Sequence, residues 1–290
     1  MRTVEPPPRE DVERVLAAAL AEDLGEAGDR TTVCLVPAGA TAEGVLLAEQ
    51  ELVAAGASIA AAVFRRLSSG VEVLSQAEDG SRLSAGDALL RVRGAARALL
   101  TGERTALNLL GRLGGIATLT RRVVDSLAGT ATRVYDTRKT TPGLRRLEKY
   151  AVRCGGGENH RSGLYDMALI KENHIAVVGG AAEAVRRARQ ALPAGLPLQV
   201  EVTTLAELEA AMEAGADLIL LDNMDRATMA EAVRRSRGRA VLEASGGIHP
   251  DTASDIARAT GVDRISLGAL TRSAPWVEVS MDLALDAHDG

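Results

Sequence analysis

A repeated pattern in the second half of the chain restricts the fold more than any other feature. Short apolar runs recur there, and each is followed by a segment with helical periodicity. The runs cover residues 133–135, 168–170, 198–200, 218–221, 240–242 and 264–267. Buried strands that alternate with helices are typical of a parallel β/α architecture. Because only six strands are visible, the pattern predicts an incomplete or unusual β/α barrel, with a doubly wound open sheet as the alternative.

Polar residues follow these runs, at the points where the strands should end. In chain order they are Asp136 with Arg138 and Lys139, then Lys171, Glu201, Asp222, Ser245-Gly246-Gly247 and Gly268-Ala269. The carboxyl ends of the strands form the active-site face of a β/α barrel. We therefore expect a catalytic barrel domain over residues 116–270, with these residues around its rim.

The first part of the chain has a different pattern. A helix is predicted over residues 10–24, and alternating stretches at 43–48, 71–74 and 88–93 are separated by turns that contain glycine. From 95 to 127 the periodicity is helical, with a predicted break at Gly114-Gly115. We interpret residues 1–115 as a small α+β sandwich domain, on which residues 271–290 are expected to pack.

The distribution of lysine points to one window as functional. The chain has 34 cationic side chains, of which only Lys139, Lys149 and Lys171 are lysine, and all three lie between residues 136 and 174. A lysine ammonium is a compact, strongly hydrated point charge that a planar guanidinium does not replace. The window therefore contains candidate positions that require this kind of charge.

The same window is basic in an acidic protein. It contains eight Lys and Arg against five Asp and Glu, whereas the whole chain has a net charge of −5. The overall acidity argues against a general nucleic-acid binder, which neutralises phosphates with many clustered cations. A solvated surface is the plainer interpretation of such a run. If its cations instead converge in a pocket, they need anionic ligands. The candidates are Arg138, Lys139, His160, Arg161 and Lys171.

Two further sets of residues suit a phosphosugar. The turns at 245–247 and 268–269 would present backbone N–H groups at the start of two helices, as phosphate-binding loops do. Glu201 and Asp222 would suit ribose hydroxyls or Mg²⁺, which prefers oxygen ligands. Alternatively, one of these carboxylates forms a structural ion pair with Lys171. No Cys and His set has the spacing of a zinc site, so metal binding by histidine is not expected.

The cysteines and the terminal sequence give a cellular context. Cys34 and Cys154 are far apart and no secretory signal accompanies them, so reduced thiols and a cytoplasmic location are expected. We interpret Cys154 as a small buried hydrophobic residue and not as a nucleophile. No apolar run reaches the roughly 18 residues of a membrane span, so no membrane role is expected.

Several sequence motifs follow one another along the chain. The central ones are Asp136-Thr-Arg-Lys-Thr-Thr-Pro-Gly-Leu-Arg145, the stretch from Lys149 to Asp166, and Leu169-Ile-Lys-Glu-Asn-His174. An N-terminal signature (Glu22-Asp-Leu-Gly, then Gly28-Asp-Arg-Thr-Thr32) precedes them, and Glu201-Val, Leu221-Asp-Asn-Met224, Glu243-Ala-Ser-Gly-Gly-Ile248 and Ser266-Leu-Gly-Ala269 follow in order. Together these motifs resemble one family, the bacterial quinolinate phosphoribosyltransferases, and the resemblance covers nearly the whole chain.

The resemblance implies a reaction and a role for each candidate. Quinolinate and phosphoribosyl pyrophosphate would give nicotinate mononucleotide, pyrophosphate and CO₂, as a step of NAD biosynthesis. Quinolinate would be held by Arg138, Lys139, His160, Arg161, Lys171 and Arg104. Phosphoribosyl pyrophosphate would contact Lys139, Lys171, Glu201, Asp222, Ser245, Gly246, Gly247, Gly268 and Ala269. Mg²⁺ would be reached from Glu201 and Asp222 indirectly, through phosphoribosyl pyrophosphate. Arg104 would enter the partner's pocket, so a homodimer with shared sites is implied.

Two alternatives to this function are open at the level of sequence. A related β/α-barrel enzyme could act on another substrate while still binding phosphoribosyl pyrophosphate. A non-catalytic phosphate-binding regulator could retain the barrel. Lys139, Lys171, Glu201 and Asp222 argue against the regulator, because a binding module has no need of charges for a leaving group.

Overall fold

The computed structural model describes residues 4–285, and the chain divides into two compact units. The first unit contains the residues up to 121, residues 141–156 and those from 274 onward, and the second contains 122–140 and 157–273. The sequence-based boundary at 115/116 therefore lies inside a helix of the first unit. Segment 141–156, which the sequence assigned to the barrel domain, groups with the first unit instead.

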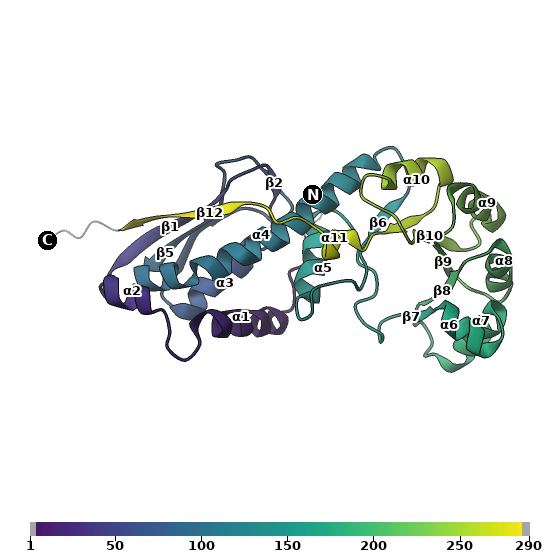
Figure 1. Ribbon diagram of the computed structural model, residues 1–290, viewed down its shortest axis with the longest axis horizontal. Coiled ribbons are helices and arrows are strands. Elements are labelled where there is room, and N and C mark those ends of the chain that lie inside the picture. Colours follow the sequence, from purple (N-terminus) through teal and green to yellow (C-terminus); the bar gives the residue numbers. More distant parts are fainter. Residues whose placement is uncertain (1–3, 286–290) are drawn as a thin grey trace. The chain divides into compact units, whose positions relative to one another are not determined.

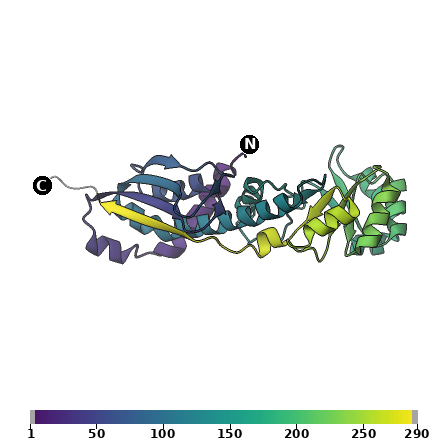
Figure 2. The ribbon, with the colours of Figure 1, turned by 90° about the horizontal axis from the view of Figure 1, so that it is seen from above.

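The first unit is built on an antiparallel sheet. Its elements are α1 (Arg9–Leu24), α2 (Arg30–Leu35), β1 (Thr41–Ala48), β2 (Leu52–Val53), α3 (Ala57–Leu67), β3 (Glu72–Gln76), β4 (Arg82–Leu83), β5 (Ala88–Ala95), α4 (Ala96–Ser126), α5 (Arg145–Cys154) and β12 (Val279–Leu285). The main sheet has the order β12-β1-β5-β3. The C-terminal strand β12 runs antiparallel beside β1 (Figures 1 and 2). Buried Leu46 lies opposite Leu90 on β5 and Met281 on β12, so one face of the sheet enters the core.

Helix α4 differs from the sequence-based expectation, because it is continuous from Ala96 to Ser126 without a break at Gly114-Gly115. A Cβ atom on Gly115 would lie 2.0 Å from the carbonyl oxygen of Pro275, and one on Gly114 would lie 2.8 Å from Val277. Glycine is needed here because the segment before β12 crosses the helix at very short range. The predicted helix break was therefore wrong.

The second unit is a parallel sheet with helices. Its elements are β6 (Arg133–Tyr135), β7 (Ala168–Ile170), α6 (Glu172–Val178), α7 (Ala181–Ala191), β8 (Leu198–Val202), α8 (Leu205–Glu213), β9 (Leu218–Asp222), α9 (Arg226–Ser236), β10 (Val241–Ser245), α10 (Ala253–Thr260), β11 (Arg264–Ser266) and α11 (Ala269–Arg272). The strand order is β6-β11-β10-β9-β8-β7, and the pairings are parallel. The six predicted strands are confirmed.

This strand order distinguishes a barrel from a doubly wound sheet. From β7 to β11 neighbouring strands follow one another in chain order. The first strand, β6, lies beside β11 at the other edge of the sheet. A doubly wound sheet would reverse direction within this order. Instead the sheet curves, with helices α7 to α10 along its outer side (Figure 1). The fold is therefore a β/α barrel that is open between β6 and β7, as the sequence predicted.

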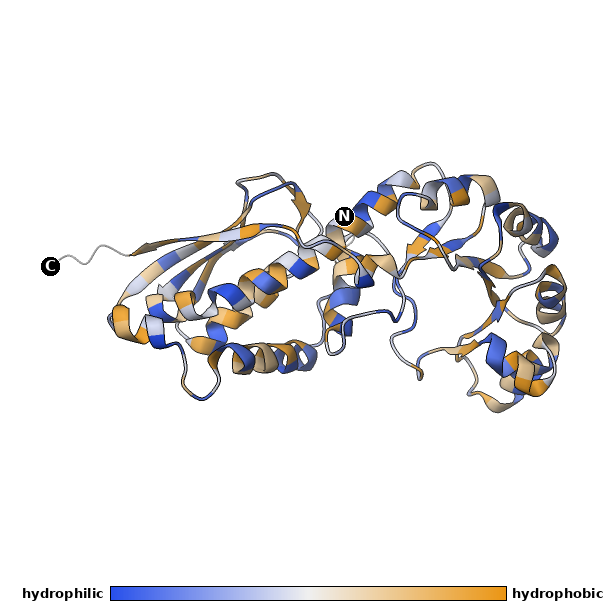
Figure 3. Cartoon of the chain, viewed as in Figure 1, coloured by the Kyte–Doolittle hydropathy of each residue, from blue (hydrophilic) through white to orange (hydrophobic). Residues whose placement is uncertain are grey.

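Apolar and polar residues alternate along strand β8, and successive side chains of a strand point to opposite faces of the sheet. On β8, Leu198, Val200 and Val202 are buried on one face, whereas Gln199 and Glu201 share the other. The hydropathy colouring in Figure 3 shows apolar residues along these strands and mixed colours on the helices outside them. The apolar face packs under the helices, and the other face carries the polar residues of the site.

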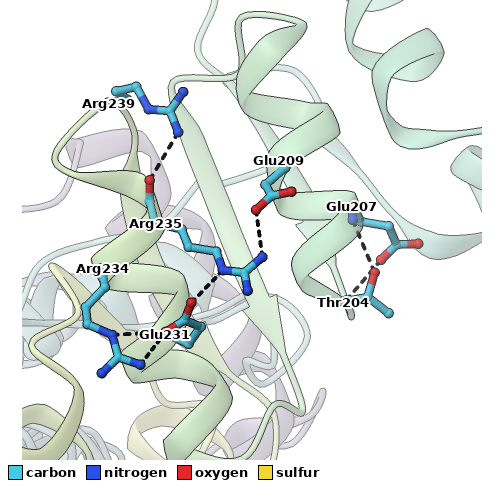
Figure 4. A network of polar contacts seen from close by, with 7 residues as sticks. All are labelled: Thr204, Glu207, Glu209, Glu231, Arg234, Arg235 and Arg239. Carbon is cyan, nitrogen blue, oxygen red and sulfur yellow. Dashed lines mark hydrogen bonds and ion pairs between the residues drawn. The ribbon is translucent and has the colours of Figure 1, made fainter.

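Charged side chains on the outer helices α8 and α9 form ion pairs with one another. Glu231 on α9 accepts hydrogen bonds from Arg234 and Arg235, and Arg235 also donates to Glu209 on α8 at 2.7 Å (Figure 4). The side chain of Thr204 caps α8 by accepting from the backbone N–H of Glu207. These arginines are solvent-exposed and serve helix packing. Within residues 4–285, no helix is both long and apolar enough to cross a membrane.

Candidate active site

Two carboxylates and a serine lie at the carboxyl ends of neighbouring strands. Asp222 ends β9 and pairs in register with Ser245, which ends β10. Glu201 on β8 lies beside Leu220, two residues before Asp222, and so faces the same side of the sheet. The structure thus places all three predicted rim residues on one edge of the barrel.

Lys139 lies next to the glycine turn that follows β11. A Cβ atom on Gly268 would lie 2.8 Å from Cδ of Lys139. The hydroxyl of Thr271 donates to the carbonyl oxygen of Lys139 at 2.8 Å, which ties the loop after β6 to helix α11. Any side chain at position 268 would displace Lys139. The glycine therefore keeps room for the lysine beside a candidate phosphate loop.

The second glycine turn is arranged differently from the expectation. Gly246 and Gly247 have φ values of 87° and 62°, and a Cβ on Gly246 would collide with Asn223. Helix α10 begins only at Ala253, so the turn at 245–247 is not itself a helix start as predicted. By contrast, α11 begins at Ala269, directly after Gly268.

Lys171 and Glu201 form an ion pair. From the sequence, this pair was the alternative to binding of ribose or Mg²⁺ by the carboxylate. The Nζ atom of Lys171 lies 3.3 Å from Oε2 of Glu201, and half of the lysine side chain is exposed. An exposed ion pair contributes about 0–1 kcal/mol, so this one leaves both groups able to change partners.

Arg138 lies close enough to Arg161 for its charge to act on the Arg161 guanidinium. Burial lowers the pKa of Arg161, and the positive charge of Arg138 lowers it further. The Arg161 guanidinium donates to the carbonyl oxygen of Met167 at 3.2 Å. Two neighbouring guanidinium groups are a binding arrangement for an anion, because arginine forks match carboxylates and phosphates.

Two carboxylates hold the segment that carries these cations. Buried Asp136 accepts from the amide of Asn159 at 2.7 Å and from the backbone N–H of His160 at 2.8 Å. Asp166 accepts from the backbone N–H groups of Ser162 and Gly163. Burial alone would raise the pKa of Asp166, but these backbone bonds outweigh it and lower the pKa. The loop is therefore fixed from both ends.

His160 uses both ring nitrogens within the protein. Its Nε2 lies 3.0 Å from Oε1 of Gln199, and its Nδ1 accepts the backbone N–H of Arg161 at 2.8 Å. Gln199 in turn donates to Glu243 at 3.1 Å. Gln199 and Glu243 were not predicted as site residues from the sequence. One signal was present, since each stands two residues before a rim residue and so shares its face of the strand.

The donor set fits Mg²⁺ only when a substrate supplies further ligands. Glu201 and Asp222 offer oxygen atoms at the rim, and the described residues contain no group of three or more His, Cys, Asp or Glu that could hold a metal ion. Mg²⁺ commonly binds through one or two carboxylates together with water and substrate phosphates. The rim is suited to a metal that arrives with a diphosphate.

Two predicted residues lie in the first unit. Arg104 is exposed on α4, on the same face as Asn108, as the spacing of four residues indicates. Cys154 is buried, and its burial raises the pKa of the thiol to about 12. A thiol with so high a pKa is not an activated nucleophile.

Comparisons with known proteins identify the family of the chain. The chain matches family models for the C-terminal domain of quinolinate phosphoribosyl transferase over residues 116–282 and for its N-terminal domain over 29–114. The carboxylating nicotinate-nucleotide pyrophosphorylase of Mycobacterium leprae is 47% identical over 270 residues, which cover 91% of this chain and 94% of the relative. A probable carboxylating nicotinate-nucleotide pyrophosphorylase of Bacillus subtilis is 43% identical, with 91% and 90% covered.

Solved structures show the same relationship. The crystal structure of NadC from Streptococcus pyogenes has a TM-score of 0.93 at 40% identity and covers 98% of this chain and 100% of its own. The nicotinate-nucleotide pyrophosphorylase of Francisella tularensis has a TM-score of 0.92 at 37% identity, with 98% and 100% covered. The chain therefore belongs to the quinolinate phosphoribosyl transferase family.

Proposed function

We propose that this protein transfers the phosphoribosyl group of phosphoribosyl pyrophosphate to quinolinate and releases CO₂, giving nicotinate mononucleotide and pyrophosphate for NAD biosynthesis. Family membership supports the reaction type, and relatives of high coverage carry the corresponding name. The substrate assignment rests on the chemistry of the site.

The observation that carries the proposal is the pairing of Arg138 with Arg161. Burial and the positive charge of Arg138 both lower the pKa of Arg161, so this charged guanidinium is costly in an empty site, and a dianion relieves that cost. Quinolinate has two adjacent carboxylates and so matches two forks. Lys139 and Lys171 add charge nearby, which a neutral or singly charged pyridine would not require.

The rim residues suit the second substrate. Glu201 and Asp222 would bind the ribose hydroxyls, and the turns at 245–247 and 268–269 would contact the 5′-phosphate through backbone N–H groups. Mg²⁺, held from Glu201 and Asp222 through the diphosphate, would supply positive charge that favours departure of pyrophosphate. Lys139 and Lys171 would neutralise the same leaving group from the protein side.

The residues then act by position and charge. The quinolinate nitrogen displaces pyrophosphate at the anomeric carbon, and the positive charge that develops on the sugar is stabilised by the nearby carboxylates Glu201 and Asp222. The alkylated ring is an electron sink, so the 2-carboxylate leaves as CO₂ and the ring carbon takes up a proton. Arg138 and Arg161 orient the dicarboxylate so that its nitrogen faces the sugar.

We further propose that the active enzyme is a cytoplasmic homodimer in which Arg104 reaches the partner's site. The exposed position of Arg104 on α4 supports a role in contacts outside its own unit. Mixing of variant subunits distinguishes this role from a surface ion pair.

The reaction is tested by product analysis with isotopically labelled quinolinate. Purified protein with Mg²⁺ and phosphoribosyl pyrophosphate should release CO₂ from the 2-carboxylate alone, one for each pyrophosphate formed. Release of pyrophosphate without CO₂ would point to a related barrel enzyme with another pyridine substrate. Absence of both products would leave a phosphate-binding module as the better account.

A further inference from the structure

Three polar side chains form a buried chain beneath the rim of the barrel. Gln199 on β8 and Glu243 on β10 are each 1% exposed, and they lie on the same strand faces as Glu201 and Ser245, two residues earlier. Gln199 joins Glu243 to the imidazole of His160 by bonds of 3.1 Å and 3.0 Å. The rim is thus supported by a second polar layer.

The chemistry of its two ends fixes the direction of every bond in this chain. The carboxylate of Glu243 can only accept, so the NH₂ group of Gln199 must face it. The carbonyl of Gln199 then faces His160 and can only accept a hydrogen bond from Nε2–H. At the far end the backbone N–H of Arg161 can only donate, so Nδ1 must be unprotonated. Both ends of the chain therefore require the same tautomer of His160, with the proton on Nε2.

We propose that Glu243, acting through Gln199, is a positioning residue that holds His160 as the Nε2–H tautomer and thereby fixes the backbone of Arg161. The inference rests on the proposed function only for the identity of the ligand that Arg161 binds. Oε1 of Glu243 has no hydrogen-bond partner in the described part of the chain and lies 3.6 Å from the same Nε2.

The consequence for the site follows from the opposite tautomer. A proton on Nδ1 would face the backbone N–H of Arg161 across 2.8 Å, and two donors cannot share that bond. The backbone N–H of His160 is held by Asp136, so the strain would move Arg161. Its guanidinium, which lies beside Arg138, would then leave the position in which it meets a carboxylate.

The first variant to examine is Glu243→Gln, which keeps the volume but replaces an acceptor with an amide that both donates and accepts. Gln199 is then free to flip, and nitrogen chemical shifts of isotopically labelled histidine should show His160 as a mixture of tautomers. The KM for quinolinate should rise by about tenfold to 100-fold, by analogy with the loss caused by removing partners that orient metal-binding histidines. The KM for phosphoribosyl pyrophosphate should change by no more than about twofold from the wild-type value.

A charge swap provides the rescue. In the double variant Gln199→Glu with Glu243→Gln, a carboxylate next to His160 again can only accept from Nε2, and the new amide at 243 donates to it. The Nε2–H tautomer and most of the quinolinate affinity should return. Thr260→Val is the matched control, because Thr260 is buried on α10 and bonds only within its helix and its own turn. It should leave the His160 shifts unchanged.

The outcomes separate this inference from the proposed function. A single Nε2–H tautomer in Glu243→Gln, a swap that folds but does not restore it, or an equal change in Thr260→Val would overturn the positioning role. If Glu243→Gln does not fold, Gln199→Met tests the same link, and an unchanged His160 tautomer there contradicts it. Failure of the wild type to consume quinolinate would reject the proposed function, while the nitrogen shifts would still decide the role of Glu243.

Discussion

The Nζ atom of Lys171 lies 3.3 Å from Oε2 of Glu201, so a cation and an anion assigned to the two substrates are partners of one another in the free protein. Half of the lysine side chain is exposed, whereas the side chain of Glu201 is only 14% exposed, so solvent weakens the pair mainly from the lysine side. Substrate binding would exchange this contact for a diphosphate and a ribose.

Lys171→Ala should therefore abolish most activity without unfolding the protein. Turnover should fall by about 100-fold or more, the loss typical of removing one group that stabilises developing negative charge. The free energy of unfolding should change by less than about 1 kcal/mol. Arg187→Ala, which breaks an exposed ion pair with Glu183 on α7, is the control and should retain activity. Near-normal turnover by Lys171→Ala would remove the role assigned to it.

Arg161→Lys should weaken quinolinate binding although the charge is kept. A lysine cannot form the planar fork that matches a carboxylate, and loss of one charge-assisted hydrogen bond costs about 1.5–3 kcal/mol, which is tenfold or more in affinity. Quinolinate should raise the melting temperature of the wild type, and this increase should shrink in the variant. An equal increase in both proteins would show that Arg161 does not bind the ligand.

Gly115→Ala should destabilise the first unit even though alanine favours a helix. The added Cβ would lie 2.0 Å from the carbonyl oxygen of Pro275, so the segment before β12 must move. We expect the free energy of unfolding to fall by about 1–3 kcal/mol, measured by denaturant titration. Gly39→Ala, with no atom within 4 Å of its Cβ, should cost almost nothing. Equal stability of the two variants would contradict the close approach.

Cys154 should resist alkylation in the native protein, whereas exposed Cys34 should react. Because burial raises the pKa of Cys154 from 9.0 to about 12, the native state favours the neutral thiol. This contribution to stability is complete below about pH 9 and is lost as the pH rises toward 12. Mass spectrometry after labelling at pH 8 should find one modified cysteine, and a second only in denaturant. Rapid labelling of native Cys154 would refute its burial.

Arg104→Ala and Arg138→Ala chains should complement one another if sites are shared between subunits. Mixed dimers would contain one site that lacks neither arginine, so part of the activity should return after subunit exchange. Exchange itself is verified by mass tags on the two chains. Verified exchange without recovery would show that each subunit uses its own Arg104 or none.

Much of the fold was accessible from sequence because it depends on local periodicity. The six strands of the barrel were placed correctly, because parallel strands are short apolar runs, and the polar residues expected after them lie at or near their carboxyl ends. The rim at Glu201, Asp222 and Ser245 followed from that rule alone.

What could not be predicted depends on contacts between distant segments. Gly115 was predicted to break the helix. Instead, a glycine is required there because the carbonyl oxygen of Pro275 comes too close for any side chain. Segment 141–156 groups with the first unit through contacts that its sequence does not encode locally. The chain from His160 through Gln199 to Glu243 joins three separate segments, so only the folded barrel shows it.

The central claim is that the paired guanidiniums select a dicarboxylate. The most direct test measures turnover of quinolinate and of nicotinate in parallel, with Mg²⁺ and phosphoribosyl pyrophosphate, by the purified protein. We predict that quinolinate is converted to nicotinate mononucleotide and CO₂ and that nicotinate is not consumed. Equal or preferred turnover of nicotinate, which has a single carboxylate, would contradict the role assigned to Arg138 and Arg161.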